Sequence, residues 1–182
     1  MQITPSTIPE VLIISPTVYQ DKRGFFFESY NQQLYHQHGI TVNFVQDNHS
    51  RSIKNTLRGL HYQIDPGQDK LVRVILGEVF DVAVDIRFGS PTFGKWVGIY
   101  LSAENKKQVF IPKGFAHGFC VVSKVAEFEY KCSEFYSPSK ERGILWNDPD
   151  LVIDWPVKNP ILSEKDRKNP LFKHISADFR YK

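Results

Sequence analysis

Cysteine is scarce in this sequence of 182 residues, where it occurs only as Cys120 and Cys132 and not in a C-x-x-C motif. Two isolated thiols favour free, buried cysteines over a disulfide or a metal site, so redox chemistry has no support. No stretch approaches the roughly 18 consecutive apolar residues of a membrane helix, and we expect a soluble protein with no membrane partner. The N-terminal residues lack the features of a secretory signal, which favours the cytoplasm.

Clustered basic charge is lacking as well. The formal net charge is +3, and Lys and Arg are scattered apart from the mixed stretch 165–168. A nucleic-acid surface needs a denser basic stripe, so we expect a small anionic ligand instead. Repeats and linkers are also missing, and a chain of this length encloses one well-packed core but is short for two. We therefore predict a single domain over residues 1–182.

The sequence does contain many short strand signals separated by turn residues. Alternation is clearest at 79–87, where the apolar side chains from Phe80 to Ile86 would share one face of a half-buried strand. Many short strands at this spacing indicate a mainly β sandwich or barrel. The predicted strands are 11–15, 24–30, 41–46, 71–76, 79–87, 96–101, 108–111, 118–122 and 126–135.

Helices are predicted at only two places. Residues 31–38 are typical of a short helix capped by Asn31 and stopped by Gly39. Ser163 is the expected cap of a second helix, with Asp166 at its third position. Prolines recur from about residue 147 onward, so we predict that 147–182 forms a tail packed on the barrel, as do the N-terminal strands.

Amides, arginines and two histidines gather in residues 46–63, at a density unusual for strands that only pack. His61 by itself is as readily a hydrogen-bonded structural histidine as a catalytic base. Its neighbours favour catalysis, because Arg23, Lys70 and Arg73 together suit a diphosphate and a developing oxyanion.

Two tyrosines, Tyr130 and Tyr136, have two open interpretations. On most strands such residues are amphipathic core residues with a satisfied hydroxyl group. In a polar barrel, a phenol is also a credible proton donor, and its ring is a stacking surface for a base.

The spacing Pro112-x-Gly114-x-x-His117 resembles the second motif of the cupin superfamily, in whose metal-binding members this histidine is a ligand. An earlier His-x-His would normally support it, but here that segment has Gln63 in place of the second histidine. A ligand set of three or four donors is therefore poorly supplied. A metal-dependent cupin oxygenase remains a distant alternative.

Seven ordered motifs, at 21–28, 46–50, 57–63, 77–87, 90–94, 112–119 and 146–148, span the chain. Together they resemble the dTDP-4-dehydrorhamnose 3,5-epimerase family. The resemblance implies a cupin-like jelly roll (double-stranded β-helix), a homodimer and no metal or other cofactor. It also implies a substrate of thymidine diphosphate joined to a 4-keto-6-deoxyhexose, in the synthesis of dTDP-L-rhamnose for lipopolysaccharide or other cell-wall polysaccharide.

The resemblance also implies catalytic roles. A C4 ketone acidifies the hydrogens on C3 and C5, so one base can remove either and a separate acid can reprotonate the opposite face. His61 matches the base, Asp166 the acid that orients it and stabilises its imidazolium, and Tyr130 the proton donor. Lys70 would stabilise the enolate oxygen.

Binding roles follow from the same resemblance. Arg23 and Arg58 would hold the diphosphate, and Tyr136 would stack on thymine. The other substrate-contacting positions are Phe26, Glu28, Gln46, Asp47, Asn48, His117, Glu141 and Lys165. A mono-epimerase acting at C3 or C5 alone is the nearest alternative, and a non-catalytic sugar-nucleotide-binding barrel is a third.

The spacing of Arg58 and His61 presents a geometrical problem. On a regular strand, residues three positions apart point to opposite faces. Gly59 could permit a bulge between them. Alternatively, the ligand could meet Arg58 where the strand ends, or the facing subunit could contribute residues such as Arg23.

Overall fold

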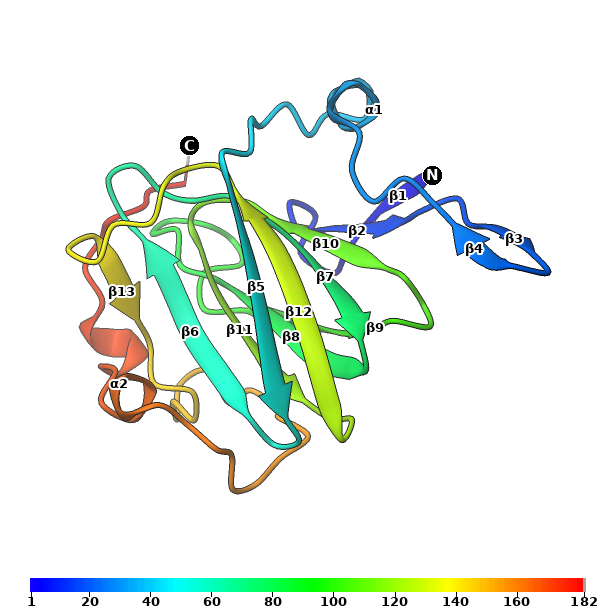
Figure 1. Cartoon of the computed structure of the whole chain (residues 1–182). Coiled ribbons are helices and arrows are strands. Elements are labelled where there is room, and N and C mark those ends of the chain that lie inside the picture. Colours follow the sequence, from blue (N-terminus) through cyan, green and yellow to red (C-terminus); the bar gives the residue numbers. More distant parts are fainter. Residues whose placement is uncertain (182) are drawn as a thin grey trace.

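The computed structural model describes residues 1–181, so residue 182 of the predicted domain and tail lies outside the described part (Figure 1). Strands dominate it, as the sequence predicts. The elements in chain order are β1 (Gln2–Pro5), β2 (Leu12–Ser15), β3 (Tyr19–Asp21), β4 (Gly24–Phe26), α1 (Gln32–Gln37), β5 (Gln46–Ile53), β6 (Leu57–Gln63), β7 (Lys70–Leu76), β8 (Glu78–Asp85), β9 (Trp96–Ser102), β10 (Gln108–Ile111), β11 (Phe115–Val121), β12 (Val125–Cys132), β13 (Glu141–Gly143), α2 (Glu164–Arg167) and the 3₁₀ turn η1 (Phe172–His174).

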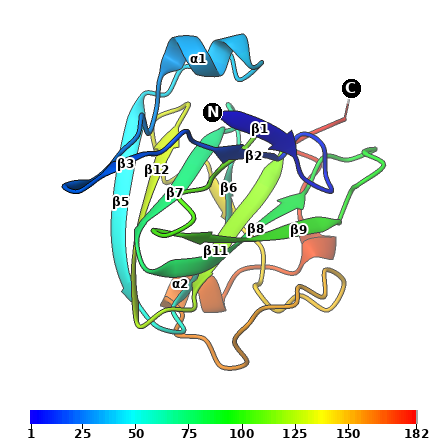
Figure 2. The same cartoon turned by 90° about the vertical axis from the view of Figure 1, so that its right-hand side faces the viewer.

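Two antiparallel sheets face each other (Figures 1 and 2). The six-stranded sheet has the order β1-β2-β10-β7-β12-β5, and the five-stranded sheet has the order β13-β6-β11-β8-β9. The eight strands from β5 to β12 are therefore divided equally between the sheets, with 5-12-7-10 facing 6-11-8-9, and only β8 and β9 are consecutive strands of one sheet. This is the strand order of a jelly roll, and it confirms the predicted fold class.

The space between the sheets holds the main core, which includes Val72, Ala83, Val109 and Phe128. These side chains occupy alternate positions of their strands, as the period of two requires. Apolar packing fills only part of the space between the sheets, and the remainder is the polar cavity described below.

A second core lies on the outer face of the five-stranded sheet. There Phe80, Val82 and Val84 of β8 pack with Leu151 and Trp155 from the C-terminal segment. Because that segment covers the sheet, β8 is buried on both faces, and the prediction of a half-buried strand was wrong. The inward-facing residues of β8 are consequently buried between the two sheets.

Both predicted helix caps are confirmed. The Asn31 side chain accepts a hydrogen bond from the Leu34 N–H, and Ser163 Oγ accepts one from the Asp166 N–H at 3.1 Å. None of the helices described within residues 1–181 is long and apolar enough to cross a membrane.

Several strand predictions need correction. Residues 41–45 are not a strand, because Val42 and Phe44 pack against the cluster around Tyr35, and β5 begins only at Gln46. The strand predicted at 24–30 ends at Phe26. Four further strands lie outside the predicted ranges. Of these, β1, β6 and β13 complete the two main sheets, and β3 pairs with β4 in a separate two-stranded sheet.

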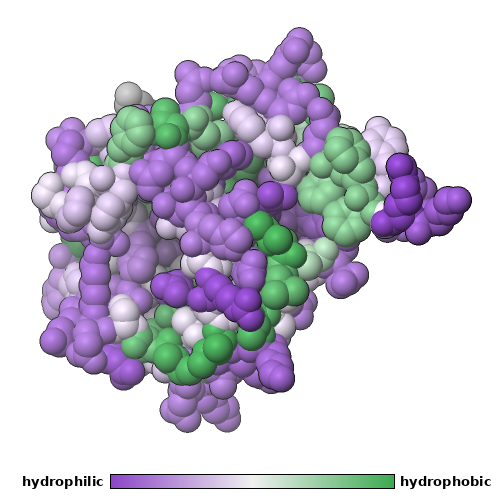
Figure 3. Space-filling model, viewed as in Figure 1, coloured by the Kyte–Doolittle hydropathy of each residue, from purple (hydrophilic) through white to green (hydrophobic). Residues whose placement is uncertain are grey.

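The β3–β4 hairpin extends away from the two sheets (Figures 1 and 2). Its aromatic residues Tyr19, Phe25 and Phe26 are exposed, Phe26 to 65%. In Figure 3, viewed as in Figure 1, an apolar patch lies between the hydrophilic tip of the hairpin and the rest of the molecule. A single chain therefore leaves a sizeable apolar surface uncovered.

Candidate active site

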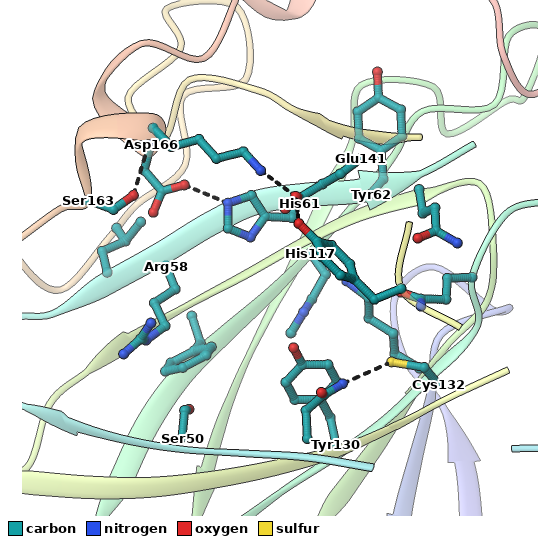
Figure 4. Close-up of a pocket in the computed structure, with 18 of the residues that line it drawn as sticks. Ser50, Arg58, His61, Tyr62, His117, Tyr130, Cys132, Glu141, Ser163 and Asp166 are labelled. Carbon is teal, nitrogen blue, oxygen red and sulfur yellow. Dashed lines mark hydrogen bonds and ion pairs between the residues drawn. The ribbon is translucent and has the colours of Figure 1, made fainter. Parts of the chain in front are cut away.

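A cavity of about 610 Å³ opens between the two sheets. Strands β5, β6, β7, β11 and β12 supply its walls, and residues 136–141 and 161–166 form its rim (Figure 4). The structure brings together most of the residues predicted from the sequence. Those lining the cavity are Gln46, Asn48, Arg58, His61, Lys70, His117, Tyr130, Tyr136, Glu141, Lys165 and Asp166.

A histidine–carboxylate pair lies on one wall. His61 Nε2 and Asp166 Oδ1 are 2.5 Å apart, and Asp166 is only 3% exposed. Burial would raise the pKa of Asp166, but hydrogen bonds from His61, Ser163 and the Gly59 N–H outweigh it and hold the pKa below its usual range. A carboxylate can only accept, so Nε2 of neutral His61 carries the proton and Nδ1 keeps its lone pair. This leaves Nδ1 available as a base.

A bulge in β6 brings Arg58 and His61 to the same face. His61 lies opposite His117 of β11, whereas Arg58 lies opposite Phe119, so three steps along β6 match two along β11. Of the alternatives that the sequence leaves open for this pair, the bulge is the one that the structure shows. Gly59 has φ +118°, and a Cβ there would come within 2.6 Å of Gly118 Cα. Only glycine fits at this position without displacing β11.

The opposite wall carries Tyr130 and Lys70 from the six-stranded sheet. Burial raises the pKa of Tyr130 to about 12, so the phenol keeps its proton at neutral pH. Figure 4 shows Tyr130 across the cavity from His61. A ligand between the sheets would therefore meet a base on one side and a proton donor on the other.

Polar contacts fix the positions of the rim residues and of the Arg58 guanidinium group. The Tyr136 hydroxyl donates to Glu141 Oε2 at 2.6 Å, and Lys165 forms an ion pair with the same carboxylate. Arg58 donates from Nε and Nη2 to Ser52 Oγ, both at 3.1 Å. These contacts hold Arg58 and Tyr136 in place at the cavity without a ligand.

Gln63 takes a structural role at the position where metal-binding cupins would have a second histidine. Its amide accepts from the Ser137 N–H at 2.9 Å and donates to the Phe135 carbonyl at 3.2 Å, and so secures the rim. Within residues 1–181, no group of three or more His, Cys, Asp or Glu side chains is arranged to hold a metal ion.

Five predicted residues lie outside the cavity of their own chain. One of them, Arg73 of β7, pairs with Glu129 at 3.2 Å. Arg23 and Phe26 belong to the projecting hairpin, and Glu28 follows it. Asp47 points to the outer face of β5, where it pairs with Lys131 at 2.9 Å. The period of two explains its position, because its neighbours Gln46 and Asn48 face inward.

The sequence pattern did not identify several residues that line the cavity or contact its lining. Ser50 and Ser52 continue the inward alternation of β5, and Cys132 continues that of β12 after Tyr130, so the pattern could have found them. Gln68 offered no such signal. The residues concerned are Ser50, Ser52, Gln63, Gln68, Phe119, Cys132 and Ser163.

A jelly roll whose cavity opposes a His–Asp pair to a buried phenol defines a cupin-like enzyme built for proton transfer, the class to which epimerases belong. The comparisons with known proteins then identify the family. The family model described as dTDP-4-dehydrorhamnose 3,5-epimerase matches residues 5–174, and the chain belongs to this family of isomerases. The resemblance seen in the motifs is confirmed.

Individual relatives cover nearly the whole chain. The dTDP-4-dehydrorhamnose 3,5-epimerase of Pseudomonas aeruginosa is 61% identical over 94% of this chain and 96% of its own length. That of Shigella flexneri is 59% identical over 98% of this chain and 99% of its own. The crystal structure of the Legionella pneumophila 3,5-epimerase in complex with dTDP-4-keto-L-rhamnose is 55% identical, with a TM-score of 0.96 and coverage of 100% and 98%.

Proposed function

We propose that this chain converts dTDP-4-dehydro-6-deoxy-D-glucose to dTDP-4-dehydro-L-rhamnose by epimerisation at C3 and C5. The observation that carries the proposal is the placement of His61 with Asp166 on one wall and Tyr130 on the other. Inversion needs a proton to leave one face of a carbon and another to arrive on the opposite face, which is what two facing walls supply.

Each inversion begins at the carbon beside the C4 ketone. Nδ1 of His61 removes the proton, and Asp166 stabilises the resulting imidazolium. The ammonium group of Lys70 stabilises the enolate oxygen. Tyr130 then delivers a proton from the other face. The imidazolium returns its proton to water and the phenolate regains one, and the second carbon follows with no net redox change.

The remaining contacts bind the nucleotide. Arg58 offers a guanidinium, already oriented by Ser52, to the diphosphate. Tyr136 lies at the rim, half exposed, where its ring can stack on thymine. Gln46, Asn48 and His117 supply hydrogen-bonding groups along the cavity between these two ends.

The working form would be a homodimer. Arg23, Phe26 and Glu28 do not reach the cavity of their own chain, and the hairpin that carries Arg23 and Phe26 exposes aromatic side chains. Insertion of this hairpin beside a second copy's cavity would bury the aromatic residues and bring Arg23 to the diphosphate. We place the reaction in the cytoplasm and its product in lipopolysaccharide or other cell-wall polysaccharide synthesis.

Turnover in deuterated water tests the proposed function. Because both new C–H bonds take their hydrogen from groups that exchange with solvent, the product should carry deuterium at C3 and C5, read by NMR. Label at one carbon only would indicate a mono-epimerase, and an unlabelled, unchanged substrate would overturn the proposal. Activity that is lost on chelation, together with stoichiometric transition metal, would instead support the cupin oxygenase.

A further inference from the structure

A second histidine–carboxylate pair lies deeper in the same jelly roll. His117 Nε2 of β11 is 2.8 Å from Asp81 Oδ2 of β8, and the two residues are 7% and 2% exposed. His117 lines the cavity, whereas Asp81 lies behind it and does not. Among the described residues, His117 is the only hydrogen-bond partner of the Asp81 side chain.

This pair is adjacent to the catalytic groups. His117 and His61 are direct cross-strand partners of β11 and β6, so their imidazoles share one wall (Figure 4). Phe128 stacks on His117 with ring centroids 6.1 Å apart. Burial lowers the pKa of His117, Asp81 opposes that shift, and the charge of Lys70 adds to it. Lys70 lines the same cavity from the facing sheet.

Lys70 is half-buried in the cavity wall, where a nearby negative charge stabilises its ammonium group. Burial lowers the pKa of Lys70, and the acidic groups Cys132, Glu141 and Asp81 oppose that shift. Burial raises the pKa of Cys132, so its thiol stays neutral. Glu141 is already paired with Lys165 and bonded to Tyr136 at the rim.

Of the three acidic groups that act on Lys70, Asp81 is therefore the one that is neither a neutral thiol nor paired with another lysine. The other groups of the wall near Lys70 are His61, His117 and the neutral phenol of Tyr130, none of which supplies a negative charge. Asp81 also determines the tautomer of its partner, because a carboxylate only accepts and Nε2 of His117 must donate.

We propose that Asp81 is a positioning residue of this site, which holds His117 with the lone pair of Nδ1 toward the cavity and keeps Lys70 charged for the enolate. The inference rests on the proposed function, in which Lys70 stabilises the enolate oxygen. His117 then serves as a neutral hydrogen-bond acceptor beside the sugar and not as a second base.

The test is Asp81→Asn, which retains an acceptor for Nε2 and removes only the charge. Without the charge, Lys70 loses its proton more readily, so the alkaline limb of the kcat–pH profile should move to lower pH by about one unit. At a fixed pH above the limb, kcat falls about tenfold. Asp81→Glu keeps the charge and should leave the alkaline limb at its wild-type position. If Asp81→Asn does not fold, Asp81→Ser replaces it with the same expected shift.

Asp85→Asn is the matched control, since Asp85 is a buried carboxylate of the same strand that does not line the cavity. It should lower the melting temperature without moving the limb. An unmoved limb in Asp81→Asn, with only a lower melting temperature, would show a merely structural role and overturn the inference.

NMR titration of Lys70 Nζ, assigned with Lys70→Met, gives a readout that is independent of turnover. The Lys70 titration should also move down by about one unit in Asp81→Asn. A wild-type protein without turnover would defeat the proposed function, whereas an unmoved Lys70 titration would defeat the inference about Asp81.

Discussion

His61 is bound to Asp166 through one nitrogen and open to the cavity through the other. His61→Ala should therefore lower kcat by at least about 10³-fold, because it removes the base that is paired with Asp166. Binding of dTDP, measured by calorimetry, should change little, since Arg58 and Tyr136 remain. His49→Ala, on the outer face of β5, is the matched control and should keep full turnover. Unchanged turnover in His61→Ala would remove His61 from its role.

The variant Tyr130→Phe tests whether Tyr130 is the proton donor on the side of the substrate opposite His61. In Tyr130→Phe, His61 can still remove a proton and return a solvent deuteron to the same face, but the phenol that delivers a proton to the opposite face is gone. We expect deuterium exchange into substrate of retained configuration, with product formation lowered by about 10²-fold. NMR in deuterated water distinguishes the two outcomes. Product formed at the wild-type rate would exclude Tyr130 as the donor.

The lowered pKa of Asp85 makes the free energy of unfolding depend on pH. Burial would raise its pKa, but hydrogen bonds from Arg87, Ser90 and Thr92 outweigh it and hold the pKa below the ordinary 3.8. A carboxylate whose pKa is lower in the folded than in the unfolded protein stabilises the fold at pH values above its pKa in the unfolded protein. That stability is lost as the pH falls through its pKa in the folded protein. Asp85→Asn should cost about 3 kcal/mol at pH 7. It should also show a flatter decline of stability below pH 4, measured by urea unfolding. A decline as steep as in wild type would contradict this assignment.

At the scale of the element, the β6 bulge brings Arg58 and His61 together. Gly59→Ala should destabilise the protein by about 3 kcal/mol, because the residue has φ +118° and its Cβ would meet β11. Gly39→Ala is the matched control, with φ +88° and nothing within 4 Å, and should cost only about 1 kcal/mol. Denaturant unfolding measures both, and equal losses would show that the clash with β11 is relieved.

Some elements could be predicted from the sequence because their side chains alternate between a buried and a polar face. The strand predicted at 126–135 corresponds to β12 for this reason, although β12 ends at Cys132. Strand β5 does not follow the rule, since its inward residues Gln46, Asn48 and Ser50 line a polar cavity. A functional requirement thus replaces the apolar signal on which strand prediction depends.

The candidate site, like the fold, could be predicted from the sequence only in part. His61, Asp166 and Tyr130 are recognisable through ordered motifs, and the bulge at Gly59 could be anticipated from their spacing. Asp81 could not, because its position in an alternating strand assigns it to a solvent-facing side. Only long-range packing of the C-terminal segment on the other face of β8 shows that Asp81 lies between the sheets.

At the scale of the whole molecule, the projecting hairpin provides a test of the proposed homodimer. Arg23 is exposed and bonded only to Asp21 of its own turn. If it completes the site of the partner protomer, Arg23→Ala should raise KM by about tenfold, the effect of one charge-assisted contact to phosphate. Lys22→Ala, one residue earlier in the same turn, is the control and should leave KM within about twofold.

A mixed dimer tests whether Arg23 acts across the interface. Arg23→Ala and His61→Ala chains with different tags are co-expressed, and the heterodimer is purified through both tags. If Arg23 acts in the partner's cavity, one site of the heterodimer combines an intact His61 with an intact Arg23, while the other lacks both. At substrate concentrations below KM, the heterodimer should then recover about half of wild-type activity per dimer, because one of its two sites is complete. If Arg23 acts within its own chain, neither site is complete, and the heterodimer should be no more active than half of the Arg23→Ala homodimer.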